Sequence, residues 1–152
     1  MNSGRNHSHQ TNLSSDRVYR LINPVRAGFP SPAAEYIETA LDPMDLLLPN
    51  PDSSFFGKVV GNSMEDVFVR NNDFIIVDKS IEPRSGNVVM CSLDGTFLTK
   101  ILRVEGRKRT LVSGNPAYPP IAITSENEFQ LWGVVSKSIH DLLLRGQGVR
   151  AR

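Results

Sequence analysis

Short apolar segments separated by turn residues fill the chain from residue 55 onward, and they restrict its possible folds more than any other feature. Turns are marked by Asn71-Asn72-Asp73, Asp94-Gly95 and Glu105-Gly106. Asp-Gly between two apolar runs is a strong hairpin signal. Short runs separated by Gly, Asn, Asp and Pro indicate a mainly β domain. We expect strands near residues 55–60, 74–77, 88–93, 97–104, 110–112, 121–123 and 129–138.

The chain before residue 55 carries different signals. Its first 23 residues are rich in Ser, Asn, His, Gln and Arg, which predicts a flexible arm. Several prolines then interrupt any regular structure. Residues 33–41 could form a short helix. Asp42 followed by Pro43 is typical of a helix N-cap with proline at the first helical position, and predicts a helical turn through Leu48.

Length and charge predict one domain with two appendages. The chain has 152 residues, which suits a single domain with extensions. Residues 1–27 carry a net charge of +3 and residues 145–152 another +3, whereas residues 28–144 hold ten basic and fifteen acidic side chains. We therefore predict a flexible arm over 1–27, a domain over 28–144 and a basic tail over 145–152. An acidic domain disfavours a nucleic-acid-binding face, although the basic ends could contact nucleic acid, the domain or only solvent.

Composition excludes several classes of protein. No apolar run approaches the roughly 18–20 residues that span a bilayer, and the first 25 residues lack the apolar stretch of a signal peptide. A single cysteine, Cys91, excludes an internal disulfide and a four-cysteine zinc site. His7 and His9 make only a weak metal site on a flexible arm. We expect a cytoplasmic protein with no membrane contact, metal or cofactor.

Ser63 is the first candidate for chemistry. A serine–histidine–aspartate site needs a histidine in the domain, and only His140 lies outside the arm. Ser63 follows Gly61 where an apolar run gives way to a turn, so its hydroxyl is exposed beside backbone N–H groups. The structural alternative is a capping box, Ser63-Met64-Glu65-Asp66, in which the serine only caps a helix.

Lys100 supplies a possible base. In the strand expected over 97–104, side chains alternate in direction, so Lys100 shares a face with Leu98, Leu102 and Val104. Its ammonium could reach water beside these apolar groups. Alternatively the amine is buried, and burial favours the neutral form, which can take a proton from a serine hydroxyl.

The residues Ser63 and Lys100, in this order after an Ala27-Gly28 junction, resemble the LexA-type self-cleaving serine peptidases. Within that family, the similarity is greatest to accessory subunits of SOS-response polymerases, and it covers residues 27–140. Two departures stand out: Val67-Phe68 replaces a glycine-rich turn, and Asn72 stands where glycine is usual, although asparagine tolerates left-handed backbone. The matching stretches are Ala27–Ala34, Gly61–Met64, Phe74–Asp78, Asp94–Lys100, Asn115–Tyr118 and Trp132–Val135.

The resemblance implies a fold and a function. The fold would be a mainly β peptidase domain of short, highly twisted strands. Ser63 would be the nucleophile, Lys100 the general base and Ala27–Gly28 the scissile bond, with backbone amides of Ser63 and Met64 as the oxyanion hole. The chain would act as a homodimer and cut itself when stimulated by a RecA filament on single-stranded DNA. The product would serve a Y-family (UmuC-like) error-prone polymerase in translesion synthesis.

Two alternatives remain open on the sequence. The chain could be a binding module that holds a polymerase without cleaving itself. It could also be related to a LexA-like repressor, which is disfavoured because no DNA-binding domain fits into 27 residues.

Overall fold

The computed structural model describes residues 19–23 and 37–143, and the chain divides into two compact units between Leu46 and Leu47. The predicted cleavage junction Ala27–Gly28, the histidines His7 and His9 and the basic tail over 145–152 lie outside the described residues. Each unit is described by itself below.

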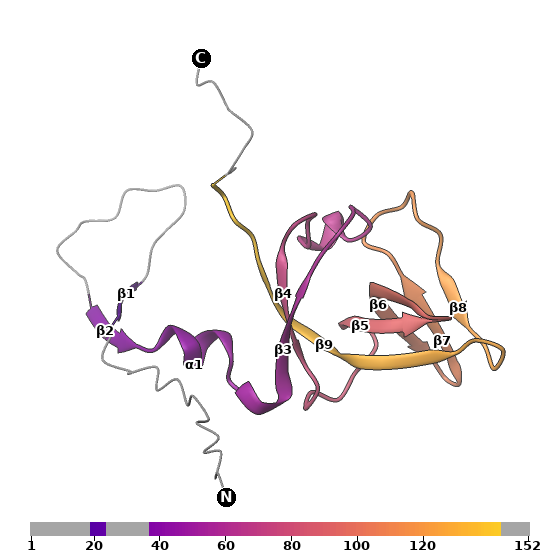
Figure 1. The fold of residues 1–152 in the computed structure, drawn as a ribbon, viewed down its shortest axis with the longest axis horizontal. Coiled ribbons are helices and arrows are strands. Elements are labelled where there is room, and N and C mark those ends of the chain that lie inside the picture. Colours follow the sequence, from indigo (N-terminus) through magenta and orange to yellow (C-terminus); the bar gives the residue numbers. More distant parts are fainter. Residues whose placement is uncertain (1–18, 24–36, 144–152) are drawn as a thin grey trace, which may run out of the picture. The chain divides into compact units, whose positions relative to one another are not determined.

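The first unit contains a two-stranded antiparallel sheet (Figure 1). Strand β1 (Tyr19–Asn23) pairs with β2 (Ile37–Leu41), with Tyr19 opposite Leu41 and Asn23 opposite Ile37. One expectation is therefore wrong: residues 37–41 are a strand rather than part of a helix. Their partner strand lies within the predicted arm, whose flexibility stays a prediction. The β-branched Ile37 and Thr39 suit a strand, and pairing supplies backbone hydrogen bonds that a five-residue helix largely lacks.

A short helix, α1 (Pro43–Leu47), follows as the sequence predicts. The N–H of Met44 donates a 2.8 Å hydrogen bond to Asp42 Oδ1, so the aspartate caps the helix and Pro43 occupies its first position. No helix in the described ranges is long and apolar enough to cross a membrane.

The second unit is built on one seven-stranded sheet of order β3-β4-β9-β5-β6-β7-β8, in which every neighbouring pair is antiparallel. All seven strands predicted from the apolar runs are present, and the expected fold class is confirmed. Two short 3-10 helices, η1 (Pro51–Ser53) and η2 (Glu65–Val67), complete this unit. The strands are β3 (Ser54–Lys58), β4 (Phe74–Asp78), β5 (Val88–Leu93), β6 (Thr96–Glu105), β7 (Lys108–Val112), β8 (Ile121–Ile123) and β9 (Phe129–Ile139).

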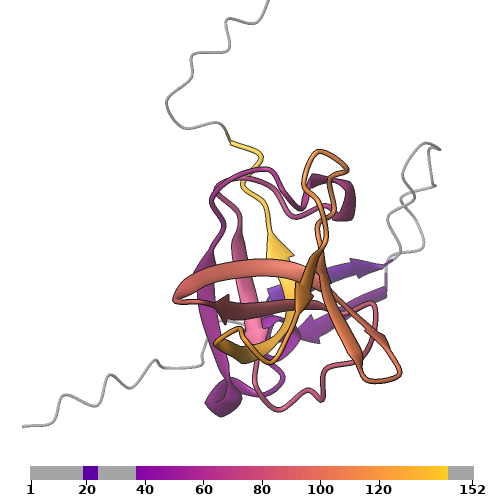
Figure 2. The ribbon, with the colours of Figure 1, turned by 90° about the vertical axis from the view of Figure 1, so that its right-hand side faces the viewer.

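The longest strand, β9, joins the two parts of this sheet. Residues 129–134 of β9 pair with β5, and residues 134–139 pair with β4. The register shifts at Ile76/Val77 and at Met90/Cys91, and such irregularities increase local twist. The sheet is consequently strongly curved, with β3 and β4 running steeply across the direction of β5 (Figures 1 and 2).

Curvature divides the buried apolar residues into two clusters. The first, called here the sheet cluster, fills the space between β5, β6, β7 and β9. The second, called the Met64 cluster, lies beneath the turn that carries Ser63. The sheet cluster consists of Val89, Cys91, Leu93, Leu102, Leu111 and Val134, and the Met64 cluster of Val59, Met64, Val69, Ile75 and Val77.

Candidate active site

Ser63 lies in a turn that follows β3, which we call the serine turn (residues 59–64). Gly61 has a φ of +95°, where a Cβ would be strained, and its N–H donates a 2.8 Å hydrogen bond to Asn71 Oδ1. At the base of the turn, the N–H of Asn72 donates to the carbonyl of Val59 over 2.9 Å. Buried Met64 anchors the other end in the Met64 cluster. The turn is therefore held on both sides of the serine.

The chain lacks glycine at two places where the LexA-type family usually has it, at Val67-Phe68 and at Asn72. The backbone is left-handed at both places. Asn72 has a φ of 72°, and Phe68 a φ of 62°. Asparagine tolerates this conformation at small cost, whereas a bulky residue adopts it rarely. Phe68 is held there because its N–H donates to the Glu65 carbonyl at the end of η2. The chain thus adopts left-handed backbone at both positions without glycine.

The capping box predicted as the structural alternative for Ser63 is absent from the described residues. Met64, rather than Ser63, occupies the N-cap position of η2, and no side chain caps it. The N–H of Asp66 donates instead to the carbonyl of Gly114 over 2.8 Å. The hydroxyl of Ser63 is therefore left for another partner.

That partner is Lys100. On the face of β6 that alternation assigns to Lys100, Lys100 is 6% exposed and Leu102 is 5% exposed, whereas Val104 near the strand end is 36% exposed. Of the two alternatives for Lys100, the structure therefore shows the buried one. Lys100 Nζ donates a 2.8 Å hydrogen bond to Ser63 Oγ. Two residues separated by 36 others in the chain thus meet at one point, which the sequence could indicate only through the family resemblance.

Burial changes the acid–base properties of this amine. Removal from water disfavours the ammonium and lowers the pKa of Lys100, against a smaller opposing influence from the Cys91 thiol. Burial also raises the pKa of Cys91 to about 11, so at neutral pH that group is an uncharged thiol. A neutral amine at hydrogen-bond distance from a hydroxyl is the arrangement that general-base activation of a serine requires.

A loop between β7 and β8 forms a further wall of the site. Asn115 Nδ2 donates to the Asn62 carbonyl over 3.0 Å, and the Tyr118 hydroxyl donates to Asn62 Oδ1 over 2.6 Å. The loop approaches closely because Gly114 has no Cβ: one placed there would lie 2.9 Å from a methyl group of Val67. The sequence assigned no role to Asn115 or Tyr118, because nothing local indicates that this loop meets the serine turn.

Two cavities open onto the pair. One, of about 320 Å³, extends from Ser63 and Lys100 toward Gly57 and Phe97. The other, of about 360 Å³, extends toward Tyr118 and Ile121. Concave spaces of this size beside a nucleophile suit a short peptide segment.

The N–H groups predicted as an oxyanion hole are free of other acceptors in the described part of the chain. Neither Ser63 nor Met64 donates a backbone hydrogen bond there, whereas the Met64 carbonyl accepts from Val67 and Val69. Their assignment stays a prediction, as do the catalytic roles of Ser63 and Lys100 and the junction at Ala27–Gly28.

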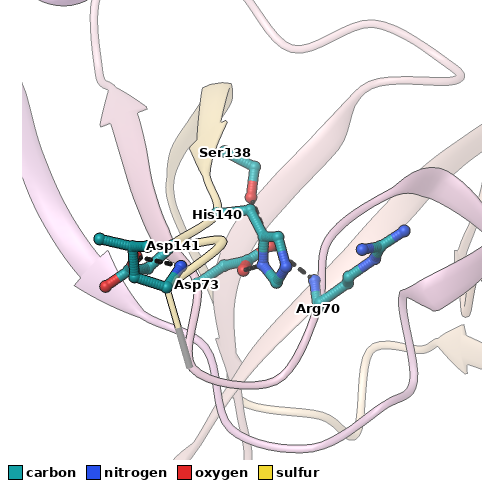
Figure 3. Close-up of polar contacts among 6 residues, drawn as sticks. Arg70, Asp73, Ser138, His140 and Asp141 are labelled. Atoms are coloured by element: carbon teal, nitrogen blue, oxygen red, sulfur yellow. Dashed lines mark hydrogen bonds and ion pairs between the residues drawn. The ribbon is translucent and has the colours of Figure 1, made fainter. Parts of the chain in front are cut away.

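A second polar cluster contains serine, histidine and aspartate but not in catalytic order (Figure 3). Buried Asp73 accepts hydrogen bonds from Ser138 Oγ at 3.0 Å and from the Arg70 N–H at 2.8 Å, and its other oxygen contacts His140 Nδ1 at 2.5 Å. In a catalytic triad the histidine lies between the two other groups. Here Ser138 and His140 both contact the carboxylate, so the cluster ties the end of β9 to the start of β4.

Comparisons with known proteins identify a family and several relatives. The Peptidase S24-like family matches residues 20–136. Protein SamA of Salmonella typhimurium is 39% identical over 114 residues, which cover 75% of this chain and 79% of SamA. Protein MucA of Escherichia coli is 33% identical over 127 residues, covering 82% of this chain and 86% of MucA. The LexA repressor of Bordetella avium is 35% identical over 122 residues, covering 79% of this chain and 56% of the repressor.

Proposed function

Because the chain belongs to the Peptidase S24-like family, we propose that it is a self-cleaving serine peptidase that cuts its own Ala27–Gly28 bond. The observation that carries this proposal is the 2.8 Å hydrogen bond between Lys100 Nζ and Ser63 Oγ at the meeting point of two cavities. A buried lysine beside a serine supplies both a nucleophile and a base without a histidine.

The proposed reaction has two stages. Neutral Lys100 takes the hydroxyl proton of Ser63 while Oγ attacks the carbonyl carbon of Ala27, and the N–H groups of Ser63 and Met64 stabilise the resulting oxyanion. The C–N bond to Gly28 then breaks, and the Lys100 ammonium returns the proton to the leaving amine. Water, deprotonated by Lys100, hydrolyses the ester between Ala27 and Ser63. The products are residues 1–27 and 28–152.

We further propose a cellular role like that of UmuD, which the chain resembles. Cleavage would be stimulated by a RecA filament on single-stranded DNA in the cytoplasm. The product 28–152 would act as a homodimer that assists a Y-family, UmuC-like, error-prone polymerase in translesion synthesis. The similarity to SamA and MucA, which extends over 79% and 86% of their own lengths, supports this assignment.

The test is mass spectrometry of the purified full chain after incubation with RecA, ATP and single-stranded DNA. We expect a new fragment with the mass of residues 28–152. Ser63→Ala and Lys100→Ala should each abolish it, whereas Lys108→Ala, which removes an exposed lysine, should leave it unchanged. A cut at another bond would refute the junction. Normal cleavage by Lys100→Ala would refute the base, and an intact chain that binds a polymerase would favour a non-cleaving binding module.

A further inference from the structure

Tyr118 contacts Lys100 directly and is linked to Ser63 only through the preceding residue, Asn62. Lys100 Nζ lies over its ring, 5.6 Å from the centroid. Its hydroxyl donates a 2.6 Å hydrogen bond to Asn62 Oδ1, in the residue immediately before Ser63. One side chain therefore bridges strand β6 and the serine turn.

Hydrogen bonds within the loop that carries Tyr118, and from this loop to Asn62, hold the tyrosine in place. Asn115 Nδ2 donates to the Asn62 carbonyl, and Asn115 Oδ1 accepts from the N–H of Ala117. The N–H of Tyr118 donates to the Asn115 carbonyl over 3.1 Å. Asn62 is thus held through its backbone by one loop residue and through its side chain by another. The tyrosine is nevertheless 42% exposed, so packing alone does not account for its placement.

We propose that Tyr118 is a positioning residue whose hydroxyl fixes the serine turn and whose ring stabilises the charged form of Lys100, restraining self-cleavage in the resting protein. An ammonium within about 6 Å of an aromatic centroid is attracted by the negative face of the ring. The neutral amine gains little from that face. The ring therefore opposes burial, which favours the neutral amine.

Of the other groups facing Lys100, only Cys91 opposes the effect of burial on the pKa, and its influence is the smaller of the two. Cys91 on β5 is an uncharged thiol at neutral pH, because burial raises its pKa to about 11. The Ser63 hydroxyl, from the serine turn, accepts a hydrogen bond and carries no charge. Within the described residues, no carboxylate forms an ion pair with Lys100. The ring of Tyr118 is accordingly the group whose removal should change the charge of the lysine.

The inference rests on the proposed function for its effect on cleavage, but its physical core can be measured without cleavage. The probe is ¹³C-lysine NMR of the full chain carrying Ser63→Ala, which cannot cut itself, with and without a second substitution. Tyr118→Leu should lower the pKa of Lys100 by about half a unit or more. Tyr118→Phe keeps the ring and should therefore leave the pKa of Lys100 as it is in the chain that carries Ser63→Ala alone. Phe97→Leu removes another exposed aromatic residue of the same cavity and should not change the pKa.

The direction of the change in the pKa of Lys100 shows whether the ring stabilises the ammonium or only excludes water from it. If Tyr118 only covered the lysine, its removal would admit water and raise the pKa, which would overturn the proposal. An unchanged pKa, or an equal fall in Tyr118→Phe, would also overturn it.

The Tyr118 substitutions are then made in the chain that keeps Ser63, to test whether a lower pKa of Lys100 speeds self-cleavage. Without an activator, Tyr118→Leu should displace the alkaline rise of the rate to lower pH, giving about threefold faster cleavage near neutrality. Tyr118→Phe should keep the pH dependence of the parent. A chain that never cleaves but shows the fall in pKa would support the inference and refute the proposed function. A chain that cleaves but shows no such fall would refute the inference alone.

Discussion

Lys100 has to satisfy opposing requirements at the scale of a single residue. Its stem packs on the buried face of β6, whereas its nitrogen needs a polar partner, and Ser63 Oγ provides one at 2.8 Å. The lowered pKa increases the neutral fraction at a given pH, although a free lysine is neutral in only about one molecule in 2,500 at pH 7. Only a small fraction of Lys100 is therefore in the neutral form that can act as the base.

The first prediction concerns the pH dependence of self-cleavage without an activator. The rate should rise about tenfold per pH unit until the folded-state pKa of Lys100 is passed, because only the neutral amine acts as a base. Mass spectrometry of a pH series from 7 to 10 measures this, with Lys100→Ala as control. A flat profile, in a protein that cleaves when activated, would contradict the mechanism.

The effect of Lys100 on stability has the corresponding sign. Its folded-state pKa lies below the unfolded value, so folding favours the neutral amine. Above the unfolded pKa the amine is neutral in both states and adds no penalty. As the pH falls from the unfolded value through the folded one, the contribution of this group to stability weakens.

The second prediction concerns Asp73, which is 1% exposed. Burial alone would raise its pKa, but hydrogen bonds from Arg70, His140 and Ser138 together lower it below the ordinary 3.8. Asp73→Asn should reduce the free energy of unfolding at neutral pH by about 2 kcal/mol, because the amide cannot accept all these bonds. Urea denaturation measures the loss, with exposed Asp52→Asn as control.

The same variant tests the sign of the pH effect. A carboxylate with a lowered folded-state pKa contributes stability that is present above its unfolded pKa and is lost as the pH falls through the folded value. The difference between wild type and Asp73→Asn should therefore shrink below pH 3.8. A difference that is constant down to pH 2 would show that the charge of Asp73 is not involved.

At the scale of elements, the site depends on the contact between η2 and the loop that follows β7. The N–H of Asp66 donates to the Gly114 carbonyl, and the Gly114 N–H lies 3.4 Å from Met64 Sδ. A Cβ on Gly114 would approach the Met64 backbone to 3.3 Å as well as Val67. Strand pairing does not depend on this contact, but the distance between the serine turn and the Tyr118 loop does.

The third prediction follows from that contact. Gly114→Ala should slow RecA-stimulated cleavage at least tenfold while the far-ultraviolet circular dichroism of the sheet stays unchanged, since small displacements of reacting groups are costly. Ser54→Ala is the control, because the buried Ser54 hydroxyl lines neither cavity and has no hydrogen-bond partner within the described residues, so its loss should be neutral. Equal rates for the two variants would show that the close approach at Gly114 is not required.

At the scale of the whole molecule, both apolar clusters are made within the second unit. Every member that the structure describes lies between Val59 and Val134, and the residues packed against them begin at Phe55. Removal of residues 1–27 would separate β1 from β2 but would take nothing from either cluster.

The fourth prediction is that cleavage leaves the second unit equally stable. The product 28–152 and uncleaved Ser63→Ala should differ by no more than about 0.5 kcal/mol in free energy of unfolding at equal protein concentration. Fluorescence of Trp132, the single tryptophan, reports this unit because it lies on β9 and contacts Phe97 at 5.6 Å between ring centroids. A clearly less stable product would show that residues 1–27 support the sheet.

The sequence by itself determined the mainly β class, the strand positions in the second unit, the side chains that share a face of β6 with Lys100 and membership of the peptidase family. These features are local or near-local: turn residues bound each strand, and alternation along one strand decides which side chains are buried. Asp42 and Pro43 likewise predicted α1 correctly, because capping involves only adjacent residues.

Only the tertiary structure decided where distant segments meet. Residues 37–41 could form part of a short helix as judged from the sequence, yet pairing with β1 makes them a strand, because cross-strand hydrogen bonds outweigh a weak helical preference. The contacts of Ser63 with Lys100, and of Tyr118 with Asn62, depend on the curvature of a sheet whose strand order is not the order of the chain. Side-chain periodicity shows which face of a strand is buried but not what lies opposite it, and the chemistry of this site depends on what lies opposite.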